Sequence, residues 1–377
     1  MKAGLLLKVV LIFVVLVAFI FVFDVLMCQR VSIYEGAKNM GYTDDSAAIS
    51  DAKAAQISNQ PAPVGYPPGT SPCSITKLRL LDYCIKGSAN SAFSGSYTSN
   101  EMIQYVLSRG VRFLDLQVFW IDGQNGQDAY VGYTSNKLSY APDGIKNTNI
   151  PPLSYILSTI VKNAFVQLQG SNYVVTNPTD PLFIQIRLQT DTSTMTALYD
   201  RIQKILSVAL RDNSISYGNT QVSQFTPLSQ IHKKLLIGFD SDDYYTVRPD
   251  GNNPNDYVNF LTNSETMRML TYNEVNPTYN INISPPKSIG QYTTDVANFY
   301  YVQPDNDTSP QPNPNALQVV KMYGTQVILN QYYAADTNLI NSEVMFSACN
   351  GGIVPLRLCL AYINNTAEPS ETEIPTK

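Results

Sequence analysis

The sequence has almost no histidine and little charge. Its 377 residues include a single histidine, His232, and only 15% of them are charged, against about 25% in an average soluble protein. Histidine is the side chain whose ordinary pKa lies nearest neutrality, so catalysis by a pair of histidines is excluded. A formal net charge of -5 without a basic cluster argues against nucleic acid as a partner.

One long apolar segment stands at the N-terminus. Residues 5–27 are interrupted only by Lys8 and Asp24, and about 20 apolar residues are enough to span the hydrocarbon core. A cleaved signal peptide is the alternative, but residues 25–28 lack the small side chains of a cleavage site. We therefore expect a single-pass membrane anchor in residues 1–30, with the lipid bilayer as a partner.

Composition divides the remaining chain into segments. Residues 31–72 hold an alanine-rich stretch, expected to be a helix at 44–58, and then a proline-rich spacer. The main domain is expected over residues 73–363, and 364–377 form a polar tail. Residues 240–315 are rich in Asn, Pro, Asp and Tyr, which predicts a large insertion with irregular loops.

Strand and helix patterns alternate through the main domain. The expected buried strands are 111–118, 182–188, 234–239 and 327–330, and the expected amphipathic helices are 99–109, 153–165 and 196–210. Such alternation is typical of an α/β fold with a parallel sheet. The pattern alone does not choose between a closed barrel and an open, doubly wound sheet.

Two segments have the form of a catalytic motif without its histidine. Residues 86–91, KGSANS, resemble the S-H-N-T segment of the phosphatidylinositol-specific phospholipase C family, with Ala89 in the place of the histidine. Residues 130–134, YVGYT, resemble the Y-H-G-x-T segment of that family, with Val131 in the place of the second histidine. Further segments resemble family motifs in the same order, at residues 110–116, 227–237, 323–330 and 336–355.

The resemblance implies a distorted (β/α)8 TIM barrel with its site at the C-terminal ends of the strands. In the family, one histidine deprotonates the inositol hydroxyl and the other protonates the leaving group. General acid/base catalysis contributes about 10²–10⁴-fold per group. Since Ala89 and Val131 can transfer no proton, the resemblance implies a pseudoenzyme with no catalytic residues.

The cation site that the resemblance implies is altered as well. Calcium-using members of the family place Asn, Glu, Asp and a second Glu around the ion, and the matching positions here are Asn90, Asp115, Gln117 and Arg187. Calcium takes about six to eight oxygen ligands, and a guanidinium repels it. We therefore expect neither a metal nor a cofactor. Asp115 and Arg187 have two interpretations, an ion pair at the barrel mouth or the remnant of a phosphate site.

Three functions remain open. The first, which the lost histidines favour, is a non-catalytic, membrane-anchored protein whose barrel docks onto other structural proteins. The second is a module that binds an inositol phosphate or a lipid headgroup. The third is a weakly active phosphodiesterase with unorthodox residues, such as His232, which otherwise belongs to an exposed turn. The anchor, spacer and Asn- and Tyr-rich loops resemble membrane-linked virion proteins of large DNA viruses, where a minor capsid protein joins membrane to shell.

The five cysteines allow two interpretations. Cys28 adjoins the apolar segment, and the other four form two pairs that are close in sequence, Cys73 with Cys84 and Cys349 with Cys359. Two short-range disulfides form if the domain matures in an oxidising compartment. Four buried thiols are the alternative.

Overall fold

The computed structural model describes residues 78–366, apart from gaps at 96, 124–125, 136–141, 143–149, 166–174, 176–177, 213, 251–255, 276–298, 306–310 and 350. The expected anchor, the helix at 44–58, the spacer and most of the polar tail lie outside this range. Within the described residues, no helix is both long and apolar enough to span a bilayer. The segment boundaries expected from composition therefore stay predictions.

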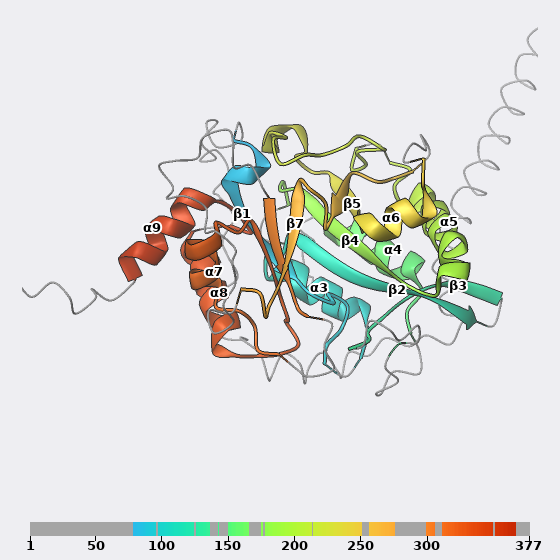
Figure 1. Ribbon diagram of the computed structural model, residues 1–377, viewed down its shortest axis with the longest axis horizontal. Coiled ribbons are helices and arrows are strands. Elements are labelled where there is room, and N and C mark those ends of the chain that lie inside the picture. Colours follow the sequence, from blue (N-terminus) through green and yellow to red (C-terminus); the bar gives the residue numbers. More distant parts are fainter. Residues whose placement is uncertain are drawn as a thin grey trace, which may run out of the picture. The chain divides into compact units, whose positions relative to one another are not determined.

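The described chain forms a nearly closed barrel of parallel strands (Figure 1). The strands pair in the order β6-β5-β4-β2-β1-β9-β8-β7, and each neighbouring pair is parallel. The two end strands, β6 and β7, lie side by side without a hydrogen-bonded ladder. The bounds are β1 Tyr83–Ser88, β2 Phe113–Gly123, β4 Leu182–Gln189, β5 Leu235–Asp240, β6 Phe260–Thr262, β7 Met267–Thr271, β8 Phe299–Gln303 and β9 Val327–Asn330.

Two further strands pair antiparallel to the barrel strands. β3 (Gly126–Gly132) forms a ribbon with the second half of β2, and Figure 1 shows the two strands running out together beside α5. β10 (Ile353–Pro355) pairs with the first half of β1. The ribbon is fastened to α5 by an ion pair between Asp128 and Arg201.

Helices connect most of the barrel strands, as a (β/α) barrel requires. The α-helices are α3 Asn100–Ser108, α4 Leu153–Asn163, α5 Thr192–Ala209, α6 Ser241–Val247, α7 Ala316–Tyr323, α8 Thr337–Ala348 and α9 Leu356–Thr366, with 3-10 turns at η1 Leu80–Asp82 and η2 Leu228–Gln230. Local residues determine where these helices begin and end, as α3 shows. The Ser99 side chain accepts a hydrogen bond from the Met102 N–H and so caps α3. Gly110, with φ of 81°, supplies the left-handed residue after α3.

The core has an inner and an outer part. Inside the barrel, large side chains from neighbouring strands fill the space, and Phe113, Phe183 and Phe260 pack with ring centroids 5.8 Å apart in each pair. Outside it, the apolar faces of the helices cover the sheet. Because apolar rings fill one part of the interior, polar side chains are confined to the other, at the C-terminal ends of the strands.

The fold confirms the barrel and the periodic elements but corrects one segment. Each strand and helix expected in the main domain is present, with bounds shifted by a few residues. Residues 240–315, expected to be an irregular insertion, instead supply α6, β6, β7 and β8. The expectation was wrong because these strands have only three to five residues, too short for a periodic pattern among so many Asn and Tyr residues.

Candidate functional site

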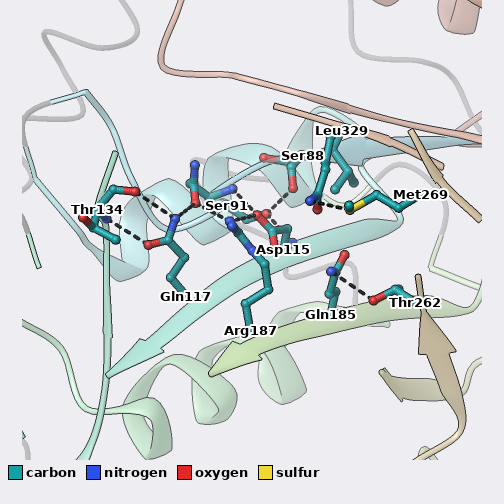
Figure 2. A network of polar contacts seen from close by, with 12 residues as sticks. Ser88, Ser91, Asp115, Gln117, Thr134, Gln185, Arg187, Thr262, Met269 and Leu329 are labelled. Atoms are coloured by element: carbon teal, nitrogen blue, oxygen red, sulfur yellow. Dashed lines mark hydrogen bonds and ion pairs between the residues drawn. The ribbon is translucent and has the colours of Figure 1, made fainter. Parts of the chain in front are cut away.

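Strand register brings the expected polar residues together. Asp115 and Gln117 are two positions apart in β2, so their side chains share one face of the strand. Arg187 in β4 stands in register with Gln117. Asn90 follows β1 in a turn and takes a left-handed conformation with φ of 46°, which asparagine tolerates better than most residues. These four residues come from three adjacent strands, and the structure places them in one network. Figure 2 labels Asp115, Gln117 and Arg187 of this network.

An ion pair between Arg187 and Asp115 is the centre of this network. Arg187 Nε donates to Asp115 Oδ1 and Arg187 Nη2 donates to Asp115 Oδ2, each over 2.7 Å. Arg187 Nη2 also donates to Asn90 Oδ1 over 2.8 Å. The paired, bidentate geometry is the strongest that a guanidinium and a carboxylate form. The same guanidinium therefore binds oxygens of Asn90 and Asp115, two of the four residues that the family resemblance places at the cation site.

Gln117 extends the network to the loop after β3. Its Nε2 donates to Asn90 Oδ1 over 2.9 Å and to the Thr134 carbonyl over 3.1 Å. The Thr134 N–H donates back to Gln117 Oε1 over 2.9 Å. A side-chain amide carries both hydrogen-bond donors and a hydrogen-bond acceptor, and Gln117 uses both kinds. A carboxylate at this position could not make the two donated bonds.

The network is buried, and Arg187 keeps its charge. The Asp115 side chain is 1% exposed and that of Arg187 is 11% exposed. Burial lowers the pKa of Arg187, but the charge of Asp115 and the hydrogen bonds to it outweigh burial, so this pKa lies above its ordinary value. Arg187 is therefore a permanent cation. It is therefore unsuited to act as a general acid or base near neutral pH.

Of the two positions that lack histidine, only one lies beside the network. Ala89 is buried directly before Asn90, in the inner core. Val131 pairs opposite Val118 across the β2–β3 ribbon, and both belong to the outer core. Since neighbouring strand residues alternate between faces, Val131 lies on the face opposite Asp115 and Gln117. Although the motif match groups Val131 with the site residues, its side chain faces the outer core rather than the network.

Aromatic residues that the sequence analysis did not single out lie against the network. The Asn90 Nδ2 donates to the Tyr333 hydroxyl over 3.2 Å. Phe93 stacks on Tyr133 with a centroid distance of 3.9 Å, and it meets Tyr333 edge-on at 4.9 Å. Phe93 and Tyr333 closely follow β1 and β9, and Tyr133 follows β3. Of the three, only Tyr333 follows a strand that the sequence predicts, at 327–330, and that position was the signal that could have identified it.

The inward-facing residues around the network are neutral. Gln185 Nε2 donates to Thr262 Oγ1 over 3.2 Å (Figure 2). Gln303 Nε2 lies 2.7 Å from Met269 Sδ. Across residues 78–366, excepting the gaps, no group of three or more His, Cys, Asp or Glu side chains is arranged to hold a metal ion. Asp115 is therefore the only carboxylate in the network itself, and its partner is Arg187.

His232 stands apart from this site. It lies in the turn between η2 and β5 and is half-buried. That turn leads into the N-terminal end of β5, whereas the network occupies the C-terminal side of the barrel. The structure thus agrees with the expectation that His232 is a turn residue, and it does not place His232 beside Asp115 or Arg187.

Comparison with solved structures finds phospholipases C. A calcium-dependent phosphoinositol-specific phospholipase C from Pseudomonas sp. aligns over 78% of this chain and 99% of its own, with 10% identity and a TM-score of 0.47. A calcium-dependent enzyme from Streptomyces antibioticus aligns over 74% and 99%, with 8% identity and a TM-score of 0.41. PLC21 of S. officinalis aligns over 74% of this chain but only 37% of its own length, with 15% identity and a TM-score of 0.44.

The chain is similar to these enzymes over most of its own length. No protein-family model and no curated protein matches the sequence. The barrel itself is established by the order and pairing of the strands.

Proposed function

We propose that this chain is a non-catalytic structural or interaction protein built on a phospholipase C-like barrel. One observation carries the proposal. The guanidinium of Arg187 is bound by the oxygens of Asp115 and Asn90, two of the four residues that the family resemblance assigns to the cation site. A covalently attached cation replaces an exchangeable one, so the barrel mouth is stabilised without a metal.

The groups of the network offer no acid/base pair. Phosphodiester cleavage by the family mechanism needs one group that accepts a proton and one that donates it near neutral pH. Ala89 has no titratable atom, Gln117 is an amide, and Arg187 stays protonated because its pKa is raised. Asp115 is a carboxylate whose oxygens are held by Arg187 and by the Asn90 N–H. These features favour a structural role over a weak phosphodiesterase.

A headgroup-binding module receives little support from the same geometry. A phosphate site needs positive charge or N–H donors directed at the ligand. Arg187 is the cation of the network, and its Nε and Nη2 are directed at Asp115 and Asn90. The rings of Phe93, Tyr133 and Tyr333, which carry no positive charge, lie against the same network.

The proposal includes the membrane anchor at residues 5–27, which lies outside the described residues. Its support is the apolar run itself. With the spacer behind it, the barrel would stand off the bilayer and dock onto other structural proteins. A minor capsid protein that ties a virion membrane to its shell is the specific form of this role, by analogy with the composition of such proteins.

Vesicle flotation distinguishes the proposed functions. The full chain is reconstituted with phosphatidylcholine vesicles or with vesicles that also contain phosphatidylinositol phosphates, and a variant lacking residues 1–30 is treated in parallel. We expect the full chain to float with both kinds of vesicle and to resist extraction by alkaline carbonate, because an apolar helix holds it. The shortened variant should float with neither.

Two results of this experiment would contradict the proposal. Flotation of the shortened variant only with the inositol lipid would show headgroup binding by the barrel. Release of the full chain by carbonate would show that residues 5–27 do not form an integral membrane anchor. The double variant Asp115→Asn with Arg187→Gln, made in the shortened chain, is the matched control, because it removes the charges of the network without leaving a buried charge unpaired.

A further inference from the structure

Three cysteine thiols meet on the outer side of the barrel wall. Cys84 lies in β1, Cys349 follows the last turn of α8, and Cys359 lies in α9. All three are buried, unbonded thiols within the hydrophobic cluster that packs α7, α8 and α9 against β1 and β10. The Cys359 thiol is hydrogen-bonded to both the Cys349 thiol and the Cys84 thiol. Cys359 is therefore the shared member of the cluster.

The surroundings favour thiol chemistry rather than metal binding. The neighbours in the cluster include Phe346, Val354 and Leu360, which are apolar. In the described part of the chain, no group of three or more His, Cys, Asp or Glu side chains is arranged to hold a metal ion. Two thiols already in contact need little movement to reach the geometry of a disulfide.

We propose that Cys349 and Cys359 are a disulfide site that ties α9 to α8, and that Cys84 replaces Cys349 as the partner when Cys349 is removed. Two observations select Cys349 as the first partner. Cys349 is 8% exposed while Cys84 and Cys359 are fully buried. Cys349 and Cys359 are also close in sequence, so the loop that their bond closes costs little entropy.

The bond forms while the chain folds. In the folded protein, the contact with Cys359 and burial raise the pKa of Cys349. The contact with Cys349 lowers the pKa of Cys359, but the contact with Cys84 and burial outweigh it and raise that pKa. Both thiols therefore stay protonated and react slowly. Before α9 docks, a disulfide oxidant of the glutathione type can react. The Cys359 thiolate attacks one sulfur and expels a glutathione thiolate. The Cys349 thiolate then attacks Cys359 Sγ and expels the second, and the two protons pass to the two glutathione molecules.

Peptide mapping tests this site in the full chain. The protein is refolded in a mixture of reduced and oxidised glutathione, alkylated, and cut with trypsin without reduction. Cleavage after Arg79, Lys86, Lys321 and Arg357 separates the three cysteines into the peptides 80–86, 322–357 and 358–377. We expect peptide 322–357 joined to peptide 358–377, at a mass two hydrogens below their sum, while peptide 80–86 carries the alkyl group.

Two variants complete the test. In Cys349→Ser, peptide 358–377 should be joined to peptide 80–86 instead, and in Cys359→Ser none of the three peptides should be joined. Alkylation of both Cys349 and Cys359 in the refolded wild-type protein would overturn the proposal, as would a wild-type bond between Cys359 and Cys84. A bond from Cys359 to Cys73 or Cys28 would also overturn it. If Cys84 and Cys359 are both alkylated in the Cys349→Ser protein, Cys84 does not replace Cys349 as the partner of Cys359.

Discussion

Replacing Glu343 by glutamine should lower the free energy of unfolding by about 3–5 kcal/mol, because it removes one partner of a buried ion pair. The Glu343 carboxylate is 1% exposed and forms ion pairs with Lys86, which is fully buried, and with Arg109 over 2.5 Å. The Tyr332 hydroxyl donates to it over 2.6 Å. Burial lowers the pKa of Lys86 to about 8 even with Glu343 beside it. Without that carboxylate, the buried ammonium loses its counter-charge.

Urea unfolding of the two proteins measures this difference. A matched control is Asp128→Asn, which breaks the ion pair with Arg201, a side chain that is 41% exposed. Surface pairs contribute about 0–1 kcal/mol, so this variant should unfold close to the wild type. A Glu343→Gln protein as stable as the Asp128→Asn protein would show that the buried cluster contributes little.

Replacing Arg187 by methionine should also destabilise the protein by about 3–5 kcal/mol, because it leaves the buried Asp115 carboxylate without its cation. The sign of the change carries information about function. Residues kept for catalysis or ligand binding often cost stability, and their removal is then neutral or stabilising. A network kept for structure loses stability when it is broken.

The double variant Asp115→Asn with Arg187→Met is the control for this prediction. It removes both charges, so no buried charge is left unpaired, and it should recover a substantial part of the stability that Arg187→Met loses. Thermal or urea unfolding of the wild type, the two single variants and the double variant gives the coupling energy. An Arg187→Met protein that is more stable than the wild type would favour a ligand site over a structural ion pair.

The sequence predicted the elements in which periodicity is strong. Helices such as α4 and strands such as β4 have apolar residues at regular spacing, and their side chains face a core, so pattern and structure agree. β6, with three residues, has no room for a pattern. Its place in the barrel follows from pairing with β5, which is a tertiary effect that local sequence does not record.

The candidate site was predicted in part. Asn90, Asp115, Gln117 and Arg187 were expected at the strand ends and meet there. The face on which Val131 lies could not be predicted, since a shift of one residue moves a strand side chain to the other face and a motif match does not fix that face. Tyr333 went unnoticed because its contact with Asn90 joins positions far apart in the chain.

The most direct test of the account is the rate at which the purified full chain cleaves phosphatidylinositol, with and without calcium, measured as released inositol phosphate. We predict the background rate of the buffer in both conditions, because the proposed structural site holds Ala89 and a protonated Arg187 in place of proton-transfer groups and a metal. Asp115→Asn and His232→Gln should give the same background. Turnover above background that either substitution abolishes would contradict the account.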